Sequence, residues 1–135
     1  MRKHANWRKA VKSILSGALL TAMVSFSAHQ GATAQDQEAA TTIEYVTFKA
    51  ADGVDEAKLA RVAVDVNEAL TDYDGFIDRH VALQDDGTWV EVVYWRDLDS
   101  AKAALDKFLA DPNTKEFLAM VDPDSVKLSF STIKK

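Results

Sequence analysis

Several large polar and aromatic side chains stand close together in the segment that begins at Trp89, which reads Trp-Val-Glu-Val-Val-Tyr-Trp-Arg. Alternation along a β-strand places Glu91 on the same face as Trp89 and Trp95. A carboxylate held between aromatic rings and away from water has a raised pKa, so it can accept a proton from a phenol or an acidic C–H group. Glu91 is therefore a candidate general base. The alternative is an exposed edge position or an ion pair with Arg79 or Arg96.

His80 is the second candidate for proton transfer, because its unperturbed pKa of about 6.5 lies close to neutrality. His4 and His29 belong to the first 34 residues, so His80 is the only imidazole after them. Strand alternation places it with Phe76 and Asp78, where a surface or dimer-interface role is the alternative. One imidazole and no cysteine exclude thiol chemistry and most sites built on several histidines, so we expect no metal site.

These candidates lie on a predicted β-hairpin, in which two alternating segments flank a turn at Gln84–Gly87. The predicted elements are a strand at 42–49, a helix at 54–73, the hairpin at 75–97, a helix capped by Asp97, a short helical piece at 112–121 and a strand at 125–133. This order predicts the α+β, ferredoxin-like βαββαβ fold, with a four-stranded antiparallel sheet and two helices on one face.

The predicted strands carry more apolar side chains than two helices on one face can cover. Tyr45, Val92 and Tyr94 are examples, with apolar neighbours along each strand. An uncovered apolar sheet face is typical of an interface. We therefore expect a homodimer joined through the free face of the sheet.

The first 34 residues have the composition of a cleaved signal peptide. They hold five basic residues and no acidic one, an apolar segment at 14–28 and the small residues Ala32-Thr33-Ala34. A membrane anchor is the alternative, but an apolar segment of about 15 residues is shorter than the roughly 20 that span a bilayer. The expected organisation is a signal peptide at 1–34, a flexible leader at 35–41 and one domain at 42–135, in a periplasmic or secreted protein.

The charge of the chain changes when this segment is removed. The part after residue 34 holds eleven basic and 21 acidic residues, a net charge of −10. A domain this acidic repels phosphate backbones and anionic lipid surfaces. We therefore expect no nucleic-acid partner and no stable membrane association after signal cleavage, although a solvated surface alone also explains the charge.

Three motifs stand out along the chain: Asp74-Gly75-Phe76-Ile77-x-Arg79, the strand from Trp89 to Trp95, and Trp95-Arg96-Asp97-Leu98-Asp99-Ser100-Ala101. Together they resemble the antibiotic biosynthesis monooxygenase-like domains of the dimeric α/β-barrel superfamily. The resemblance covers about 43–133. It implies chemistry without metal, flavin or another cofactor, in which a phenol is deprotonated in a pocket between helices and sheet and the anion reduces dioxygen.

The resemblance also implies roles for single residues. Trp95 stands at the family's tryptophan position, and Tyr94, Arg96 and Arg79 are nearby groups suited to stabilising a phenolate. Asn67, on the first helix, is a further candidate, and Trp89 could also line the pocket.

The haem-degrading branch of the superfamily does not fit this sequence. Its members carry an iron-binding histidine on the later helical segment, where this chain has Leu118, and an asparagine in the first strand that has no counterpart here. We therefore do not expect haem degradation.

Two functions of different class remain open. The first is a cofactor-independent monooxygenase acting on a small aromatic or quinol-type compound. The second is a non-catalytic small-molecule-binding or stress-related dimer with the same fold.

Overall fold

The structure is a computed structural model that describes residues 39–135. The predicted signal peptide at 1–34 and most of the predicted leader at 35–41 lie outside the described residues. The elements in chain order are β1 (Thr42–Phe48), α2 (Glu56–Leu70), β2 (Phe76–Leu83), β3 (Trp89–Trp95), α3 (Leu98–Ala110), the 3₁₀ turn η1 (Pro112–Thr114), α4 (Lys115–Met120) and β4 (Lys127–Thr132).

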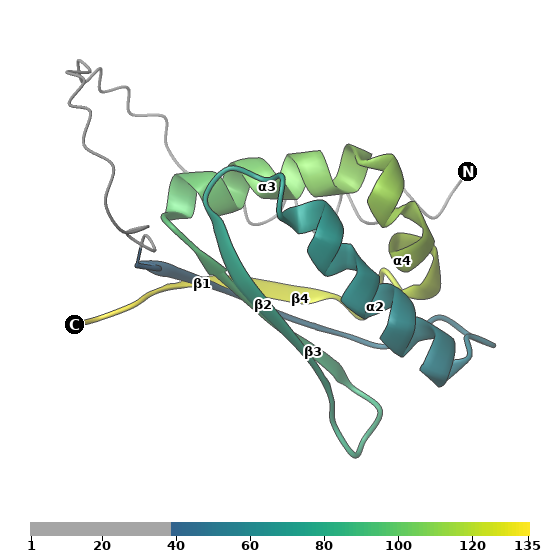
Figure 1. Ribbon diagram of the computed structural model, residues 1–135. Coiled ribbons are helices and arrows are strands. Elements are labelled where there is room, and N and C mark those ends of the chain that lie inside the picture. The colour runs from purple at the N-terminus through teal and green to yellow at the C-terminus, as the bar shows by residue number, and fades with distance from the viewer. Residues whose placement is uncertain (1–38) are drawn as a thin grey trace.

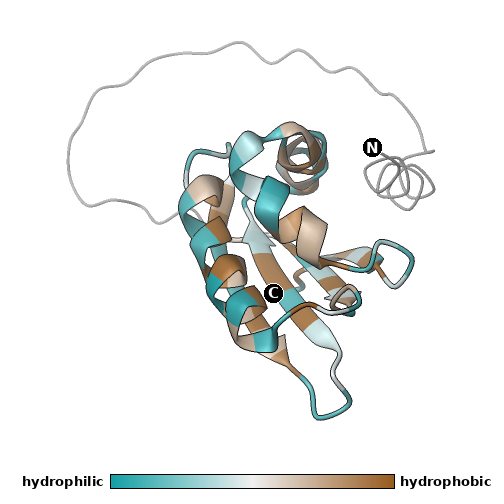
Figure 2. Cartoon of the chain, turned by 90° about the vertical axis from the view of Figure 1, so that its right-hand side faces the viewer, coloured by the Kyte–Doolittle hydropathy of each residue, from teal (hydrophilic) through white to brown (hydrophobic). Residues whose placement is uncertain are grey.

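The four strands form one antiparallel sheet in the order β2-β3-β1-β4. The helices lie on a single face of this sheet (Figure 1). Apolar and polar residues alternate along the helices and strands, as expected for elements that bury one side (Figure 2). The predicted ferredoxin-like α+β fold is therefore confirmed.

Helix α2 begins and ends through local interactions that its sequence encodes. The carboxylate of Asp55 accepts a hydrogen bond of 2.7 Å from the backbone N–H of Lys58, which caps the helix. Its buried stripe consists of Leu59, Ala63, Val66 and Leu70. The helix is shorter at both ends than the predicted range of 54–73, because residues 71–75 form a turn that leads to β2.

Helix α3 starts at its predicted cap. Asp97 accepts a hydrogen bond of 2.7 Å from the backbone N–H of Ser100. The chain leaves α3 at Asp111, and Pro112 begins η1, which continues into α4. Because proline fits the first turn of a helix and not its interior, the predicted break between two helical pieces is confirmed.

An irregularity in β2 changes one predicted side-chain direction. The pairing of β2 with β3 shifts between Phe76 and Asp78, so that Ile77 has no partner in the register. The ring of Phe76 contacts Trp95 at a centroid distance of 5.7 Å, on the face covered by helices. The assignment of Phe76 to the face of His80 is therefore wrong, because one extra residue reverses strand alternation.

The sheet reaches one residue into the predicted leader. The backbone N–H of Thr41 donates to the carbonyl of Trp95 at 3.1 Å, and the N–H of Ile133 donates to the carbonyl of Thr41 at 2.9 Å. Thr41 is therefore held from both sides. Among residues 39–135, no helix has the length and apolar character needed to cross a membrane.

Gly75 offers a test of how tightly α3 packs against the turn after α2. Its φ is +74°, and a Cβ added there would lie 2.5 Å from both Cβ and Oγ of Ser100. Gly75→Ala should lower the free energy of unfolding by roughly 2–5 kcal/mol, from a left-handed backbone of about 1–2 kcal/mol and overpacking of about 1–3 kcal/mol. Urea unfolding of the variant and the wild type measures this loss of stability.

Gly87→Ala is the matched control. Gly87 has φ +78°, and an added Cβ there meets nothing within 4 Å. It should show the backbone contribution alone. Equal losses in the two variants would contradict the close packing at Ser100.

Candidate functional site

A pocket lies between the sheet and the helices, and it is partly open to solvent. Its volume is about 40 Å³. One water molecule needs roughly 10–15 Å³ of cavity volume measured in this way, so the pocket can hold on the order of three water molecules. The lining residues are Glu44, Val46, Phe48, Leu70, Arg79, Glu91, Val93, Trp95, Ala104, Leu105, Phe108, Phe117 and Leu128.

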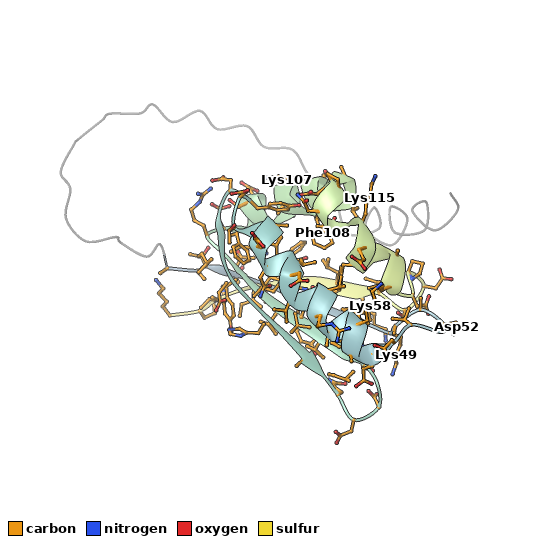
Figure 3. The ribbon with its side chains drawn as sticks, turned by 45° about the vertical axis from the view of Figure 1, so that its right-hand side comes forward. Lys49, Asp52, Lys58, Lys107, Phe108 and Lys115 are labelled. Atoms are coloured by element: carbon orange, nitrogen blue, oxygen red, sulfur yellow. The ribbon has the colours of Figure 1, made fainter. Side chains whose placement is uncertain are left out.

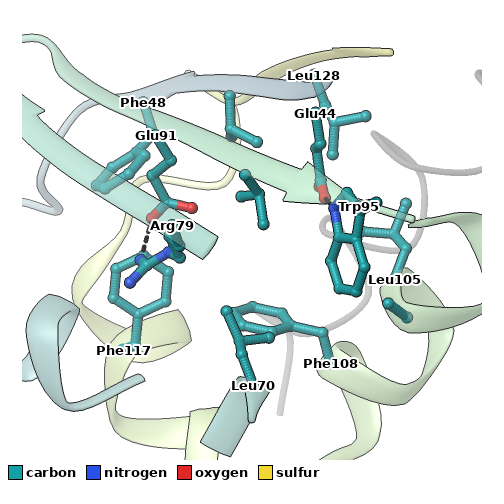
Figure 4. Close-up of a pocket in the computed structure, with 13 residues that line it drawn as sticks. Glu44, Phe48, Leu70, Arg79, Glu91, Trp95, Leu105, Phe108, Phe117 and Leu128 are labelled. Atoms are coloured by element: carbon teal, nitrogen blue, oxygen red, sulfur yellow. Dashed lines mark hydrogen bonds and ion pairs between the residues drawn. The ribbon is translucent and has the colours of Figure 1, made fainter. Parts of the chain in front are cut away.

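The lining is apolar except for four polar side chains, which are grouped in two pairs. Figure 4 shows Glu44 with Trp95 at one side of the pocket and Arg79 with Glu91 at the other. The lysines labelled in Figure 3 lie on the outer surface of helices and loops. Among the residues that line the pocket, Arg79 is the only one with a cationic side chain.

Arg79 comes from β2 and is 4% exposed. Its Nη2 donates to Oε1 of Glu91 at 2.7 Å, and its Nη1 donates to Oδ1 of Asn67 at 2.8 Å and to the carbonyl of Ala63. The guanidinium also lies 5.7 Å from the ring centre of Phe117. The side chain thereby connects β2 with β3, α2 and α4, and this network of partners stabilises its buried charge.

Glu91 forms an ion pair with Arg79, which was the alternative to a free general base. The side chains of both residues are buried, at 9% and 1% exposed. Asn67 does not line the pocket and instead accepts a hydrogen bond from Arg79.

Glu44, on β1, was missed by the sequence analysis. It is 8% exposed, and its Oε2 accepts a hydrogen bond of 2.8 Å from the indole N–H of Trp95. Burial, the dominant cause, raises the pKa of Glu44 from 4.5 to about 7; the charge of Glu91 adds to the rise, whereas Trp95 and Arg79 oppose it. No donor among residues 39–135 bonds to the other oxygen, Oε1.

A signal for Glu44 was present in the sequence. Alternation places Glu44 on the same strand face as Val46 and Phe48, which are the core residues of β1. A carboxylate aligned with two core positions is a candidate buried acid. Glu44 is not among the candidate residues predicted from the sequence.

The two tryptophans of β3 have different surroundings. Trp95 lines the pocket and is 2% exposed. Trp89 is also buried, but it stacks on Phe48 with a ring-centroid distance of 6.1 Å and does not line the pocket. Trp89 therefore belongs to the hydrophobic core, since its ring is used in packing.

Tyr94 and His80 lie on the sheet face opposite the helices, because strand alternation turns them away from Trp95 and Arg79. His80 is an exposed side chain whose Nε2 lies 3.0 Å from Oδ2 of Asp78. Its ring meets that of Tyr94 edge to face at 6.2 Å. Neither residue lines the pocket, so the predicted grouping of His80 and Tyr94 with the other candidates is not found.

Arg96 also lies outside the pocket, because it follows the end of β3 at the start of α3. Its guanidinium makes a two-pronged contact with Asp74, at 3.1 and 2.7 Å, and also donates to Asp97 and Ser100. Arg96 thus connects the turn after α2 to the first turn of α3.

Residues 39–135 contain no group of three or more His, Cys, Asp or Glu side chains that could hold a metal ion. Leu118, at the position compared with a haem-binding histidine, is buried in the core.

Comparisons with known proteins identify the fold. No family model matches the chain, and no curated protein matches it. Solved structures with the same fold include a protein of unknown function from Nitrosomonas europaea, with a TM-score of 0.57 and 14% identity over 71% of this chain and 91% of that chain.

Two further neighbours are oxygenases. SnoaB, a cofactor-independent oxygenase from Streptomyces nogalater, has a TM-score of 0.53 and 17% identity over 71% of this chain and 96% of its own. The ActVA-Orf6 monooxygenase of Streptomyces coelicolor, solved with nanaomycin D, has a TM-score of 0.54 and 21% identity over 74% of this chain and 92% of its own. At these identities the likeness shows the fold alone.

The buried ion pair should be strongly coupled. Arg79→Met should lower the free energy of unfolding by about 3–5 kcal/mol, because it leaves the Glu91 carboxylate buried without its partner. Adding Glu91→Gln should recover part of this loss. Urea unfolding of the two single variants and the double variant gives the coupling energy.

The exposed pair of Lys58 and Glu116, with an N–O distance of 3.0 Å, is the control and should show a much smaller coupling. Additive losses at Arg79 and Glu91 would contradict a direct interaction in solution.

The raised pKa of Glu44 predicts a pH dependence of stability. Between about pH 4.5 and 7 the folded chain retains a proton on Glu44 that the unfolded chain releases. The contribution is fully present below pH 4.5 and is lost as the pH rises through 7, in total about 3 kcal/mol. Glu44→Gln should remove this dependence, since glutamine does not titrate.

Urea unfolding from pH 5 to 8 tests this expectation. The difference between wild type and Glu44→Gln isolates the titration from that of other groups. Parallel stability profiles would show that Glu44 titrates normally.

Proposed function

We propose that this protein is a cofactor-independent monooxygenase that acts on a small aromatic or quinol-type compound in the pocket between sheet and helices. The observation that carries the proposal is the apolar pocket with a buried carboxylate and indole in hydrogen-bond contact, Glu44 and Trp95. The oxygenases among the solved structures of this fold support it.

The chemistry needs only the substrate and dioxygen. A phenol loses its hydroxyl proton, and the electron-rich anion reduces dioxygen and forms a carbon–oxygen bond with it. Loss of water then gives a quinone, so that phenol and dioxygen become quinone and water with one oxygen atom in each. The pocket contributes by excluding water and orienting the ring. Arg79 adds positive potential close to the anion, although it shares its charge with Glu91.

We also propose that the protein is exported and forms a homodimer through the free face of its sheet. Tyr45 on this face is 40% exposed, and Val90, Val92 and Tyr94 beside it are half-buried. Covering these apolar side chains with a second copy removes them from water. Sedimentation at micromolar concentration should show a dimer, and a monomer would count against this arrangement.

The second candidate is a non-catalytic binding protein with the same fold. The small volume of the pocket and the pairing of its only cationic lining residue favour it, since both limit the chemistry that the pocket can perform. Binding of an aromatic compound without oxygen consumption would support this candidate.

The proposed function predicts oxygen uptake by the chain without added metal or flavin. An oxygen electrode should record uptake with members of a panel of phenols and quinols, and product analysis should find the quinone. Trp95→Phe should reduce this rate, because it removes the N–H that holds Glu44.

Trp89→Phe is the matched control, since it alters a buried tryptophan outside the pocket. It should leave the rate close to that of the wild type. If compounds of the panel bind and none of them causes oxygen uptake, the non-catalytic binding protein would be favoured.

A further inference from the structure

The two carboxylates of the pocket differ in how their charges are compensated. Glu91 Oε1 accepts a charge-assisted hydrogen bond from Arg79. Glu44 Oε2 accepts only from the neutral indole of Trp95. The negative charge of Glu44 is therefore the one that the pocket leaves without a cation.

This surplus charge decides which ligand the pocket accepts. The titratable or charged side chains that line the pocket with Glu44 are Glu91 on β3 and Arg79 on β2; α3 and β4 contribute only apolar side chains. When Glu44 is ionised, the charges of Glu44, Glu91 and Arg79 add up to −1. An anionic ligand would meet this charge in a low-dielectric space, whereas a neutral hydrogen-bond donor would relieve it.

The position of the free oxygen points to the same conclusion. Glu44 lines the pocket, and no donor among residues 39–135 occupies its Oε1. A buried acceptor without a partner costs free energy, which a ligand hydroxyl group can recover. Trp95 keeps the carboxylate in place through Oε2, so that Oε1 remains available.

The size of the pocket limits the ligand to a small ring. Phe108 and Leu128 are the only half-buried residues of the lining, whereas the others are buried. They are the most exposed residues of the lining and come from α3 and the edge strand β4. A space for about three waters that is partly open to solvent fits one aromatic ring better than a fused polycyclic system.

We propose that Glu44 is the proton acceptor of this pocket and that its substrate is a neutral, single-ring hydroxyaromatic compound whose hydroxyl group binds Glu44 Oε1. This inference rests on the proposed function. The substrate O–H bond breaks, the proton moves to Oε1, and the electron pair stays on the substrate oxygen as a phenolate. The anion reduces dioxygen and a ring carbon forms a bond to one of its oxygen atoms. Glu44 then returns the proton to the outer oxygen, the O–O bond breaks, and the ring C–H gives up the second proton of the water while its electron pair forms the new carbonyl. Hydroquinone and dioxygen would thus become hydroxyquinone and water. The pKa of about 7 allows the carboxyl group to accept and release a proton near neutrality.

Hydroquinone is the probe for the test, in two measurements on the full chain. The first is calorimetric binding under nitrogen from pH 5.5 to 8.5, which is independent of turnover. Wild-type affinity should rise as the pH passes through about 7 and Glu44 becomes an ionised acceptor. The second is oxygen uptake over the same range, in which kcat/KM should show the same rise.

Glu44→Gln is the test variant, because its carbonyl oxygen can still accept from Trp95 while it cannot take a proton. It should bind hydroquinone without pH dependence and lose roughly 10²-fold or more in kcat/KM. Glu116→Gln is the matched control, because it makes the same substitution at an exposed carboxylate outside the pocket, and it should keep the rise near pH 7. Thermal unfolding of each variant verifies that it is folded.

The outcomes separate this inference from the proposed function. Oxygen uptake that is unchanged in Glu44→Gln would overturn the role of Glu44 and leave the monooxygenase function standing. Binding that depends on Glu44 without any uptake would support the contact with the hydroxyl group and overturn the enzyme. Absence of binding to the wild type would overturn both.

Discussion

The buried ion pair between Arg79 and Glu91 is the interaction on which the rest of the site depends. It connects the sheet to α2, through Ala63 and Asn67, and its guanidinium packs against Phe117 of α4. A buried charge is tolerated only when it is paired and hydrogen-bonded. The pair therefore positions the helices that enclose the pocket. In the same contact, Glu91 compensates the charge of Arg79, the only cationic side chain that lines the pocket.

The pairing of Arg79 with Glu91 is the reason for assigning the role of proton acceptor to Glu44. Because Glu91 is neutralised by Arg79, the remaining carboxylate, Glu44, experiences burial without a compensating cation. Burial is the largest cause that raises its pKa to about 7, and the charge of Arg79 opposes this rise only in part. Two carboxylates in one pocket thus have different properties because one guanidinium can pair with only one of them at short range.

The features predicted correctly from the sequence depend on local interactions. Asp97 caps α3 through a backbone N–H three residues away, and the turn at Gln84–Gly87 is closed by the N–H of Gly87, which donates to the carbonyl of Gln84. The burial of Glu44 and the irregularity at Ile77 depend on which strands pair and which sheet face the helices cover. Such long-range facts are absent from the local pattern, so the fold was predicted well and the composition of the pocket only in part.

The register of β1 against β3 connects the sequence to the proposed chemistry. Thr42 pairs with Trp95, and Glu44 pairs with Val93, so that Glu44 lies diagonal to Trp95 on the same face. Long side chains at diagonal positions can reach each other, which allows the indole to hold the carboxylate. A slip of one residue would turn Glu44 to the free face of the sheet, where water would restore an ordinary acid. The environment of Glu44 in the pocket therefore depends on the register of β1 against β3.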